Sequence, residues 1–213
     1  YSRITEVEAW GTSAPPLPTN VALATNGGVA SSSSNYSFGS LNFTAGGANN
    51  GVRSGAGWGQ GEGWNDADPA NTFPDWLQID FNGSKTIDEI DVFTVQDNYQ
   101  NPSEPTEAMT FTLYALTGFE VQYWNGSGWT TIPAGSVTGN NKVWRKFTFA
   151  PITTTKIRVL TNASVDGYSR ITEVEAWGTS APPLPTNVAL ATNGGVASSS
   201  SNYSFGSLNF TAG

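Results

Sequence analysis

The chain of 213 residues carries a net charge of −8 and contains neither cysteine nor histidine. The absence of cysteine excludes a disulfide framework and thiol chemistry, and the absence of histidine removes the commonest general base and metal ligand. The negative charge argues against nucleic acid as a partner, and no apolar run approaches the roughly 20 residues that a membrane span needs.

The two ends of the chain have the same sequence. Residues 1–46 recur letter for letter as residues 168–213, an offset of 167. An identity of this length indicates a tandem repeat with a period of 167, the alternative being an artificial duplication of one segment. A proline-rich stretch at residues 11–19 recurs at residues 179–186, and because proline fixes φ and removes a backbone donor, both stretches predict stiff linkers.

This pattern predicts one complete domain over residues 20–178. Residues 1–10 then form the terminal strand of a preceding copy, and residues 187–213 form the opening segment of a following copy. Since position 1 is not methionine, we expect a processed product or a section of a longer chain.

Strand patterns dominate the domain, and the first of them follows a long loop. Residues 46–74 are rich in Gly, Asn and Asp, and we expect this loop to be ordered because it contains Trp58 and Trp64. Short β-forming runs follow, of which the first two are separated by a turn at residues 82–84. The predicted strands cover residues 76–81, 86–95, 119–124, 129–132, 142–149, 156–161 and 169–177.

Two further features lie between predicted strands. A second loop covers residues 97–108, and Asn125-Gly126 is a strong hairpin signal between two predicted strands. No window shows a sustained helical period. The sequence therefore predicts an all-β, antiparallel sandwich or jelly roll.

Several segments together resemble a known family. The resemblance covers residues 20–178 and implies a galactose-binding-like jelly-roll sandwich. The family is the discoidin family, also called coagulation factor 5/8 type C, which overlaps carbohydrate-binding module family 32. The segments that carry it are NVALATNGGVASSSS, PDWLQIDF, FEVQYW, KVWRKFTF, TTTKIRVL and YSRITEVEAWG.

The resemblance implies a structural calcium ion near the place where the domain termini meet. The family takes ligands from an A-x-D-G-type loop, where this chain has Asn50 in place of Asp, and from a glutamate of the final strand, matched here by Glu173. Glu175 lies on the same face of that strand. Calcium prefers six to eight hard oxygen ligands. We expect a weakened calcium site at Asn50, Glu173 and Glu175, the alternative being that Glu173 is a solvated strand residue.

The resemblance also implies that ligands bind on loops at one end of the sandwich. Sugar recognition needs an aromatic face and planar polar groups. The candidate sugar-binding residues are Trp58, Trp64, Asn65, Arg53, Asn98, Tyr99 and Gln100. Alternatively, Trp58 and Trp64 only hold the long loop in place. The strand tryptophans Trp76, Trp129, Trp144 and Trp177 are expected in core or inter-sheet packing.

The sequence does not predict an enzyme. The carboxylates Glu62, Asp66, Asp68 and Asp75 cluster in one glycine-rich loop without a rigid facing partner, unlike the carboxylate pair of a glycosidase.

Two hypotheses of function are consistent with these observations. The first is a non-enzymatic extracellular module of a tandem-domain surface fibre or filament with adhesive capacity, assembled by strand donation between neighbouring copies. The alternative is a carbohydrate-binding module of an adhesin or glycoside hydrolase, which binds cell-surface or extracellular carbohydrate multivalently.

Overall fold

The computed structural model describes most of the chain and divides it into two units. One unit covers residues 17–181, and the other combines residues 1–16 with residues 182–213. The predicted proline-rich linkers fall largely outside the described residues. The described residues are 3–11, 17–180, 186–187, 189–199, 201–205 and 208–210.

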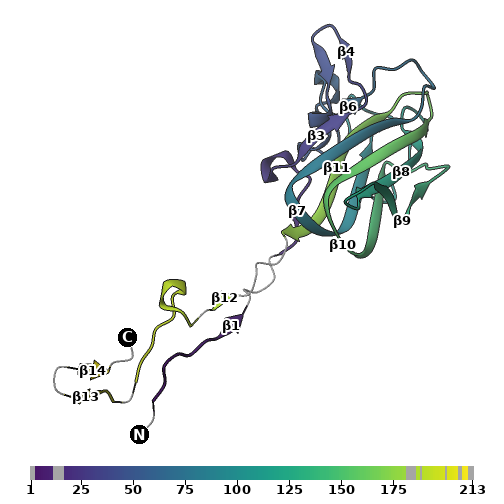
Figure 1. The fold of residues 1–213 in the computed structure, drawn as a ribbon. Helices are drawn as coiled ribbons and strands as arrows, with labels where there is room; N and C mark the ends of the chain where they lie inside the picture. Colours follow the sequence, from purple (N-terminus) through teal and green to yellow (C-terminus); the bar gives the residue numbers. More distant parts are fainter. Residues whose placement is uncertain are drawn as a thin grey trace. The chain divides into compact units, whose positions relative to one another are not determined.

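The first unit consists of β-strands joined by loops and three single-turn 3₁₀ helices (Figure 1). The strands are β2 (Thr19–Asn20), β3 (Val29–Ser32), β4 (Tyr36–Phe38), β5 (Leu41–Phe43), β6 (Trp64–Asn65), β7 (Asp75–Thr94), β8 (Leu116–Trp124), β9 (Trp129–Val137), β10 (Trp144–Ser164) and β11 (Arg170–Ser180). The helices are η1 (Ala24–Asn26), η2 (Ala45–Ala48) and η3 (Trp58–Gln60). Within the described part of the chain, no helix reaches the length and apolarity of a membrane span.

Two long strands, β7 and β10, run through both layers of an antiparallel sandwich. Residues 75–81 of β7 pair with β3 and with residues 156–161 of β10, which also pair with β8. Residues 85–94 of β7 pair instead with β11 and with residues 144–154 of β10. One layer is therefore ordered β2-β11-β7-β10 and the other β3-β7-β10-β8-β9.

The core lies between these layers and follows from the alternation of the strands. In β7, Leu77 and Ile79 are buried, whereas the intervening Gln78 is half-buried on the outer face. Val159 and Ile157 of β10 stand directly opposite Leu77 and Ile79 and are buried with them. Each such fully buried aliphatic side chain contributes about 1.5–3 kcal/mol. The predicted all-β sandwich is thus observed.

The structure corrects two details of the strand pattern. The predicted turn at residues 82–84 does not separate two strands, because Gly83, with φ +77°, lies inside the continuous β7. The predicted strands at residues 142–149 and 156–161 are likewise joined in β10, with register shifts between them. A strand that changes layers bends through such irregularities without ending.

The burial of Trp64 and of the strand tryptophans differs from the prediction. Trp64 in the long loop is fully buried in the main core, and Trp58 is 7% exposed. The strand tryptophans, by contrast, are only half-buried; these are Trp76, Trp129, Trp144 and Trp177. The long loop therefore supplies core side chains, while the strand tryptophans cover the outer faces of the sheets.

The second unit repeats local structure of the first. It contains β1 (Trp10–Gly11), β12 (Thr186–Asn187), η4 (Ala191–Asn193), β13 (Tyr203–Phe205) and β14 (Leu208–Phe210). Trp10 pairs with Asn187 and Gly11 with Thr186. The sequence-equivalent residues of the domain pair in the same way, since Trp177 faces Asn20 and Gly178 faces Thr19.

Candidate functional site

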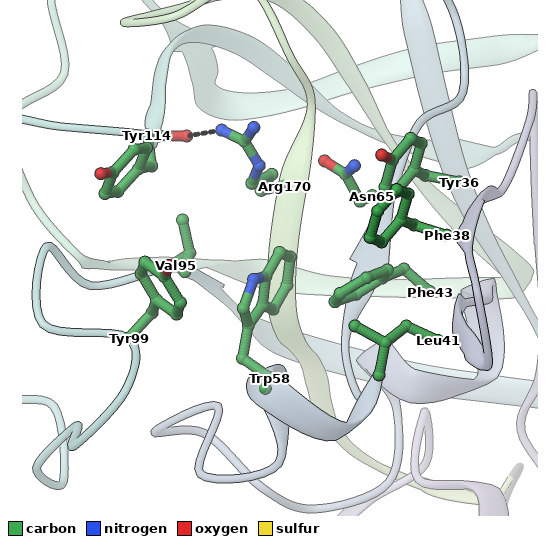
Figure 2. Close-up of a pocket in the computed structure, with 11 residues that line it drawn as sticks. Tyr36, Phe38, Leu41, Phe43, Trp58, Asn65, Val95, Tyr99, Tyr114 and Arg170 are labelled. Carbon is green, nitrogen blue, oxygen red and sulfur yellow. Dashed lines mark hydrogen bonds between the residues drawn. The ribbon is translucent and has the colours of Figure 1, made fainter.

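A cavity of about 300 Å³ opens between the β4–β5 hairpin, the long loop and the start of β11. Figure 2 shows Trp58 between the side chains of the hairpin and those of Tyr99 and Tyr114, with Arg170 and Asn65 between the two aromatic groups. The lining residues are Tyr36, Phe38, Leu41, Phe43, Trp58, Gly59, Asn65, Val95, Tyr99, Tyr114 and Arg170.

One side of the pocket is the apolar face of the β4–β5 hairpin. Tyr36 is paired with Phe43 and Phe38 with Leu41, so that all four side chains lie on one face, and we call these four residues the hairpin wall. The intervening Ser37 and Asn42 are hydrogen-bonded to each other through Oγ and Oδ1 at 2.9 Å. The hairpin is therefore amphipathic, with its apolar face toward the pocket.

The hairpin wall is anchored by Trp58. The rings of Phe43 and Trp58 lie 4.9 Å apart, and Phe43, Trp58 and Val95 form a small apolar cluster distinct from the main core. Gly63, with φ +84°, lies against the indole, because a Cβ at this position would come within 2.6 Å of a ring carbon of Trp58. A residue with a side chain at position 63 would therefore displace the ring that holds the hairpin in place.

The opposite side is formed by Tyr99 and Tyr114. Their rings meet edge to face with centroids 5.7 Å apart, which is a favourable aromatic geometry. Tyr99 is half-buried and lies in the second loop predicted from the sequence. The pocket is thus bounded on two sides by aromatic rings.

The polar part of the pocket is a cross-strand pair, Asn65 of β6 and Arg170 of β11, which we call the polar floor. The Nη1 atom of Arg170 donates to both carboxylate oxygens of Asp166, at 2.8 and 2.6 Å, and to the carbonyl oxygen of Tyr114 at 3.2 Å. The guanidinium carbon also lies 5.1 Å from the ring centroid of Tyr168. These contacts fix the guanidinium through one nitrogen, and its Nε and Nη2 make no hydrogen bond to the described residues.

Asn65 carries an unused acceptor. The residue is 6% exposed, and its Oδ1 atom is buried without a hydrogen-bond partner among the described residues. A buried polar atom that lacks a partner costs about 1–3 kcal/mol, and such atoms are rare in folded proteins. The oxygen is closed to solvent, so a ligand that donates a hydrogen bond to it would recover that cost once the amide turns into the cavity.

Three of the seven predicted sugar-binding residues line the pocket, namely Trp58, Asn65 and Tyr99. Trp64 does not, because it is fully buried and its Nε1 donates to the carbonyl oxygen of Ser34 at 2.8 Å. Arg53 is bound to Glu175, as described below. Asn98 and Gln100 are exposed in the loop beside Tyr99 and do not line the cavity.

The sequence analysis did not name the remaining pocket residues. Phe38 and Arg170 are the most informative of them, and a signal for the first was present in the sequence. Around Gly39, the run YSFGSLNF alternates aromatic or aliphatic residues with polar ones, which is the pattern of a short amphipathic hairpin. Arg170 could not be recognised in this way, because only the pairing of β11 with β6 brings it beside Asn65.

The residues predicted to bind calcium form a different arrangement. The carboxylate of Glu173 accepts hydrogen bonds from the backbone N–H groups of Asn50, at 3.0 Å, and Gly51, at 3.1 Å. Asn50 Oδ1 accepts from the N–H of Val52 at 2.8 Å. Burial raises the pKa of Glu173 to about 8, against the opposing effect of the Gly51 N–H.

Glu175 is neutralised by an arginine. Its two carboxylate oxygens accept from Nε and Nη2 of Arg53 at 2.8 and 2.7 Å. The Arg53 guanidinium also lies over the rings of Phe93 and Trp144, at 5.4 and 5.9 Å from the centroids. We call Arg53, Glu173 and Glu175 the Glu173 cluster.

This donor set does not fit a calcium ion. The N–H groups of Asn50 and Gly51 each take one acceptor position of the Glu173 carboxylate, and a guanidinium already holds Glu175. Among the described residues, no group of three or more acidic side chains is placed to hold a metal ion. The Glu173 cluster is satisfied by hydrogen bonds and an ion pair within the chain.

Two acidic residues, Asp66 of the long loop and Asp75 at the start of β7, both bind Ser169 just before β11. Asp66 Oδ1 accepts from the backbone N–H of Ser169 at 2.6 Å, and Asp75 Oδ2 accepts from the Ser169 hydroxyl at 2.7 Å. Burial raises the pKa of Asp66 to about 6 and also raises the pKa of Asp75. These carboxylates join the loop to β11, and neither lines the cavity.

Comparison with known families gives one match. Residues 47–159 match the model of the F5/8 type C family described as "NedA-like, galactose-binding domain". No curated protein matches the sequence.

Solved structures share the fold. A family 32 module of Clostridium perfringens in complex with GalNAc-β-1,3-galactose is 13% identical, with a TM-score of 0.52 over 74% of this chain and 99% of that one. The galactose-bound family 32 module of NanJ, also from C. perfringens, is 18% identical, with a TM-score of 0.52 over 76% of this chain and 99% of that one. A fucose-binding module of Streptococcus pneumoniae is 16% identical, with a TM-score of 0.53 over 75% of this chain and 95% of that one.

Proposed function

Because the chain belongs to the F5/8 type C family of galactose-binding domains, we propose that residues 17–181 form a non-catalytic module that binds carbohydrate in the pocket above the polar floor. The observation that carries the proposal is the unpartnered Oδ1 of Asn65 beside Arg170, between two aromatic walls. Aromatic rings stack on the apolar C–H face of a sugar, while a planar amide and a guanidinium bind its hydroxyl groups.

Solved structures of similar fold include a module bound to galactose and a fucose-binding module. Here the pocket contains one arginine and one asparagine as its polar side chains apart from the tyrosine hydroxyls. Repetition of the domain, which the sequence predicts, would raise the avidity of such sites for a multivalent surface.

A glycan array tests this proposal with two matched variants. Tyr99→Ala removes a half-buried aromatic side of the pocket, and we expect it to weaken glycan binding by roughly ten-fold. Trp76→Ala removes a half-buried aromatic residue outside the pocket and should leave binding unchanged. Absence of binding to every glycan at high multivalent concentration, or equal loss in both variants, would contradict the proposal.

A second candidate function is that of a repeat module in an extracellular surface fibre, with neighbouring copies of the same repeat as partners. It is favoured by the pairing of β1 with β12, whose register equals that of β11 with β2. The closing strand of one copy can therefore pair with the opening strand of another as it does within one domain. Such strand donation produces a head-to-tail, non-closing assembly with adhesive capacity.

Sedimentation velocity across the micromolar range tests this second candidate. We expect concentration-dependent association of the 213-residue chain, reduced by Gly11→Pro, which removes a backbone donor from β1 and leaves Gly178 of β11 intact. A chain that remains monomeric, with residues 1–11 and 186–210 cleaved readily by proteases, would rule out strand donation.

A further inference from the structure

The two halves of the pocket offer a ligand different chemistry. The polar floor presents an acceptor, Asn65 Oδ1, beside the guanidinium donors of Arg170. The hairpin wall presents three aromatic rings and one leucine, and apart from the Tyr36 hydroxyl it has no side-chain group that can form a hydrogen bond. No carboxylate lines the cavity.

The hairpin wall also extends beyond what the fold needs. Phe43 is buried against Trp58, but Phe38 on the same face is 69% exposed and Tyr36 is 37% exposed. A contiguous set of exposed apolar side chains at the rim of a cavity is a common mark of a contact surface. Figure 2 shows the rings of Phe38 and Phe43 on the same side of the cavity as Leu41, beside Asn65.

This arrangement penalises a hydroxyl group that faces the hairpin wall. A hydroxyl against the inner part of this wall, at Leu41 and the buried Phe43, would lose its hydrogen bonds to water without gaining others, whereas a methyl group at the same place would gain from burial against these side chains. Hydroxyl groups on the other side of the ligand would meet Asn65 and Arg170. The pocket thus favours a ligand with one apolar and one hydroxylated side.

We propose that the pocket selects a sugar residue that carries a methyl group, placed against Phe38, Leu41 and Phe43, with its hydroxyl groups on Asn65 and Arg170. The methyl group belongs either to a 6-deoxy sugar or to an N-acetyl substituent. This inference rests on the proposed carbohydrate-binding function and names the ligand class of the same site.

Two matched pairs of sugars test the selection. The full 213-residue protein is titrated by isothermal calorimetry, or by NMR where binding is weak, with L-fucose against L-galactose and with N-acetyl-D-galactosamine against D-galactose. We expect the methyl-bearing member of at least one pair to bind roughly five- to ten-fold more tightly. Preference in the first pair alone identifies a 6-deoxy sugar, and preference in the second alone identifies an acetylated one.

The outcomes separate this inference from the proposed function. If both hydroxylated parents bind as tightly as their methyl-bearing partners, the selection is wrong and sugar binding stands. If none of the four sugars binds while the array finds other glycans without such groups, the inference is likewise overturned. If the array finds no glycan at all, both proposals fail together.

A variant of the exposed ring locates the selection on the hairpin wall. Phe38→Ser should reduce the affinity ratio of the preferred pair to within about two-fold of unity, whatever its effect on the affinity that the two members share. Val29→Ser is the matched control, because Val29 is 66% exposed and lies outside the pocket. An unchanged ratio in Phe38→Ser would overturn the assignment of the methyl group to this wall.

Discussion

Arg170 and Glu173 lie three residues apart in β11. They differ in how far their polar atoms are hydrogen-bonded within the chain. Glu173 is fully buried, and both its oxygens accept hydrogen bonds from backbone N–H groups. Arg170 is held through one nitrogen and faces a cavity, beside an asparagine whose oxygen has no partner. The Glu173 carboxylate thus contributes its hydrogen bonds to the fold, whereas Arg170 and Asn65 keep hydrogen-bonding capacity at the edge of a cavity.

Removal of the ion pair in the Glu173 cluster should have the largest effect on stability. Arg53→Met leaves the carboxylate of Glu175, whose side chain is 5% exposed, without its ionic partner and with only the Trp177 Nε1–H as a side-chain donor among the described residues. We expect the free energy of unfolding to fall by about 2–4 kcal/mol. This is somewhat less than the loss of about 3–5 kcal/mol for a fully buried pair, because Arg53 is itself partly exposed. Urea denaturation measures the loss, and addition of Glu175→Gln to this variant should restore part of it. A loss below 0.5 kcal/mol (about the size of a surface effect) would contradict the role assigned to this pair.

Replacement of Glu173 should have the next largest effect on stability. Glu173→Ala removes the partner of the Asn50 and Gly51 N–H groups, and we expect a loss of about 1–3 kcal/mol by the same measurement. Binding of the preferred glycan per folded molecule should stay unchanged, because Glu173 does not line the cavity. Reduced affinity in the folded variant would show that the two regions are not independent.

The comparison also predicts how stability responds to pH. Burial raises the pKa of Glu173 from 4.5 to about 8 and that of Asp66 from 3.8 to about 6. The folded state therefore binds protons more tightly than the unfolded state, so that stability should increase as the pH falls from 7.5 to 5 and decrease as it rises again through 6. Thermal unfolding at the two pH values tests this.

Asp66→Asn mimics the protonated carboxyl and serves as the control for the pH effect. The variant should be more stable than the wild type at pH 7.5 and nearly equal to it at pH 5, because the amide keeps an oxygen for the Ser169 N–H. A larger increase in melting temperature on acidification in the variant than in the wild type would contradict the raised pKa of Asp66.

Addition or removal of calcium should have the smallest effect on stability. Because N–H donors and a guanidinium occupy the oxygens of the Glu173 cluster, we expect addition of CaCl₂ or EDTA to change the melting temperature by less than about 1 °C. For comparison, a ligand at 100 times its Kd stabilises the folded state by about 2.7 kcal/mol. A calcium-dependent rise of several degrees, lost in Glu173→Gln, would restore the calcium site implied by the family resemblance.

The sequence predicted those features that depend on local patterns. The Asn125-Gly126 turn forms the β8–β9 hairpin, with Trp124 opposite Trp129, and the alternation in residues 76–81 places Leu77 and Ile79 in the core. Both patterns act between residues close in the chain. The observed sandwich follows from their repetition along the chain.

The features that were missed depend on contacts between distant segments. Trp64 becomes a core residue because β6 pairs with β11, more than a hundred residues away, and no local pattern distinguishes it from the exposed members of the same loop. Arg53 was expected at a sugar and is found on Glu175 for the same reason. The sequence thus predicted the types of residue in the candidate site, but not which residues lie together in it.

The most direct test of the pocket compares Asn65→Ala with Glu173→Ala in stability and in glycan binding. Asn65→Ala removes a buried oxygen that has no partner, so that it should leave the melting temperature unchanged or raise it while binding falls at least ten-fold. Glu173→Ala should do the reverse, with lower stability and intact affinity. If Asn65→Ala binds glycan as well as the wild type does, the polar floor is not the binding site and the central claim is wrong.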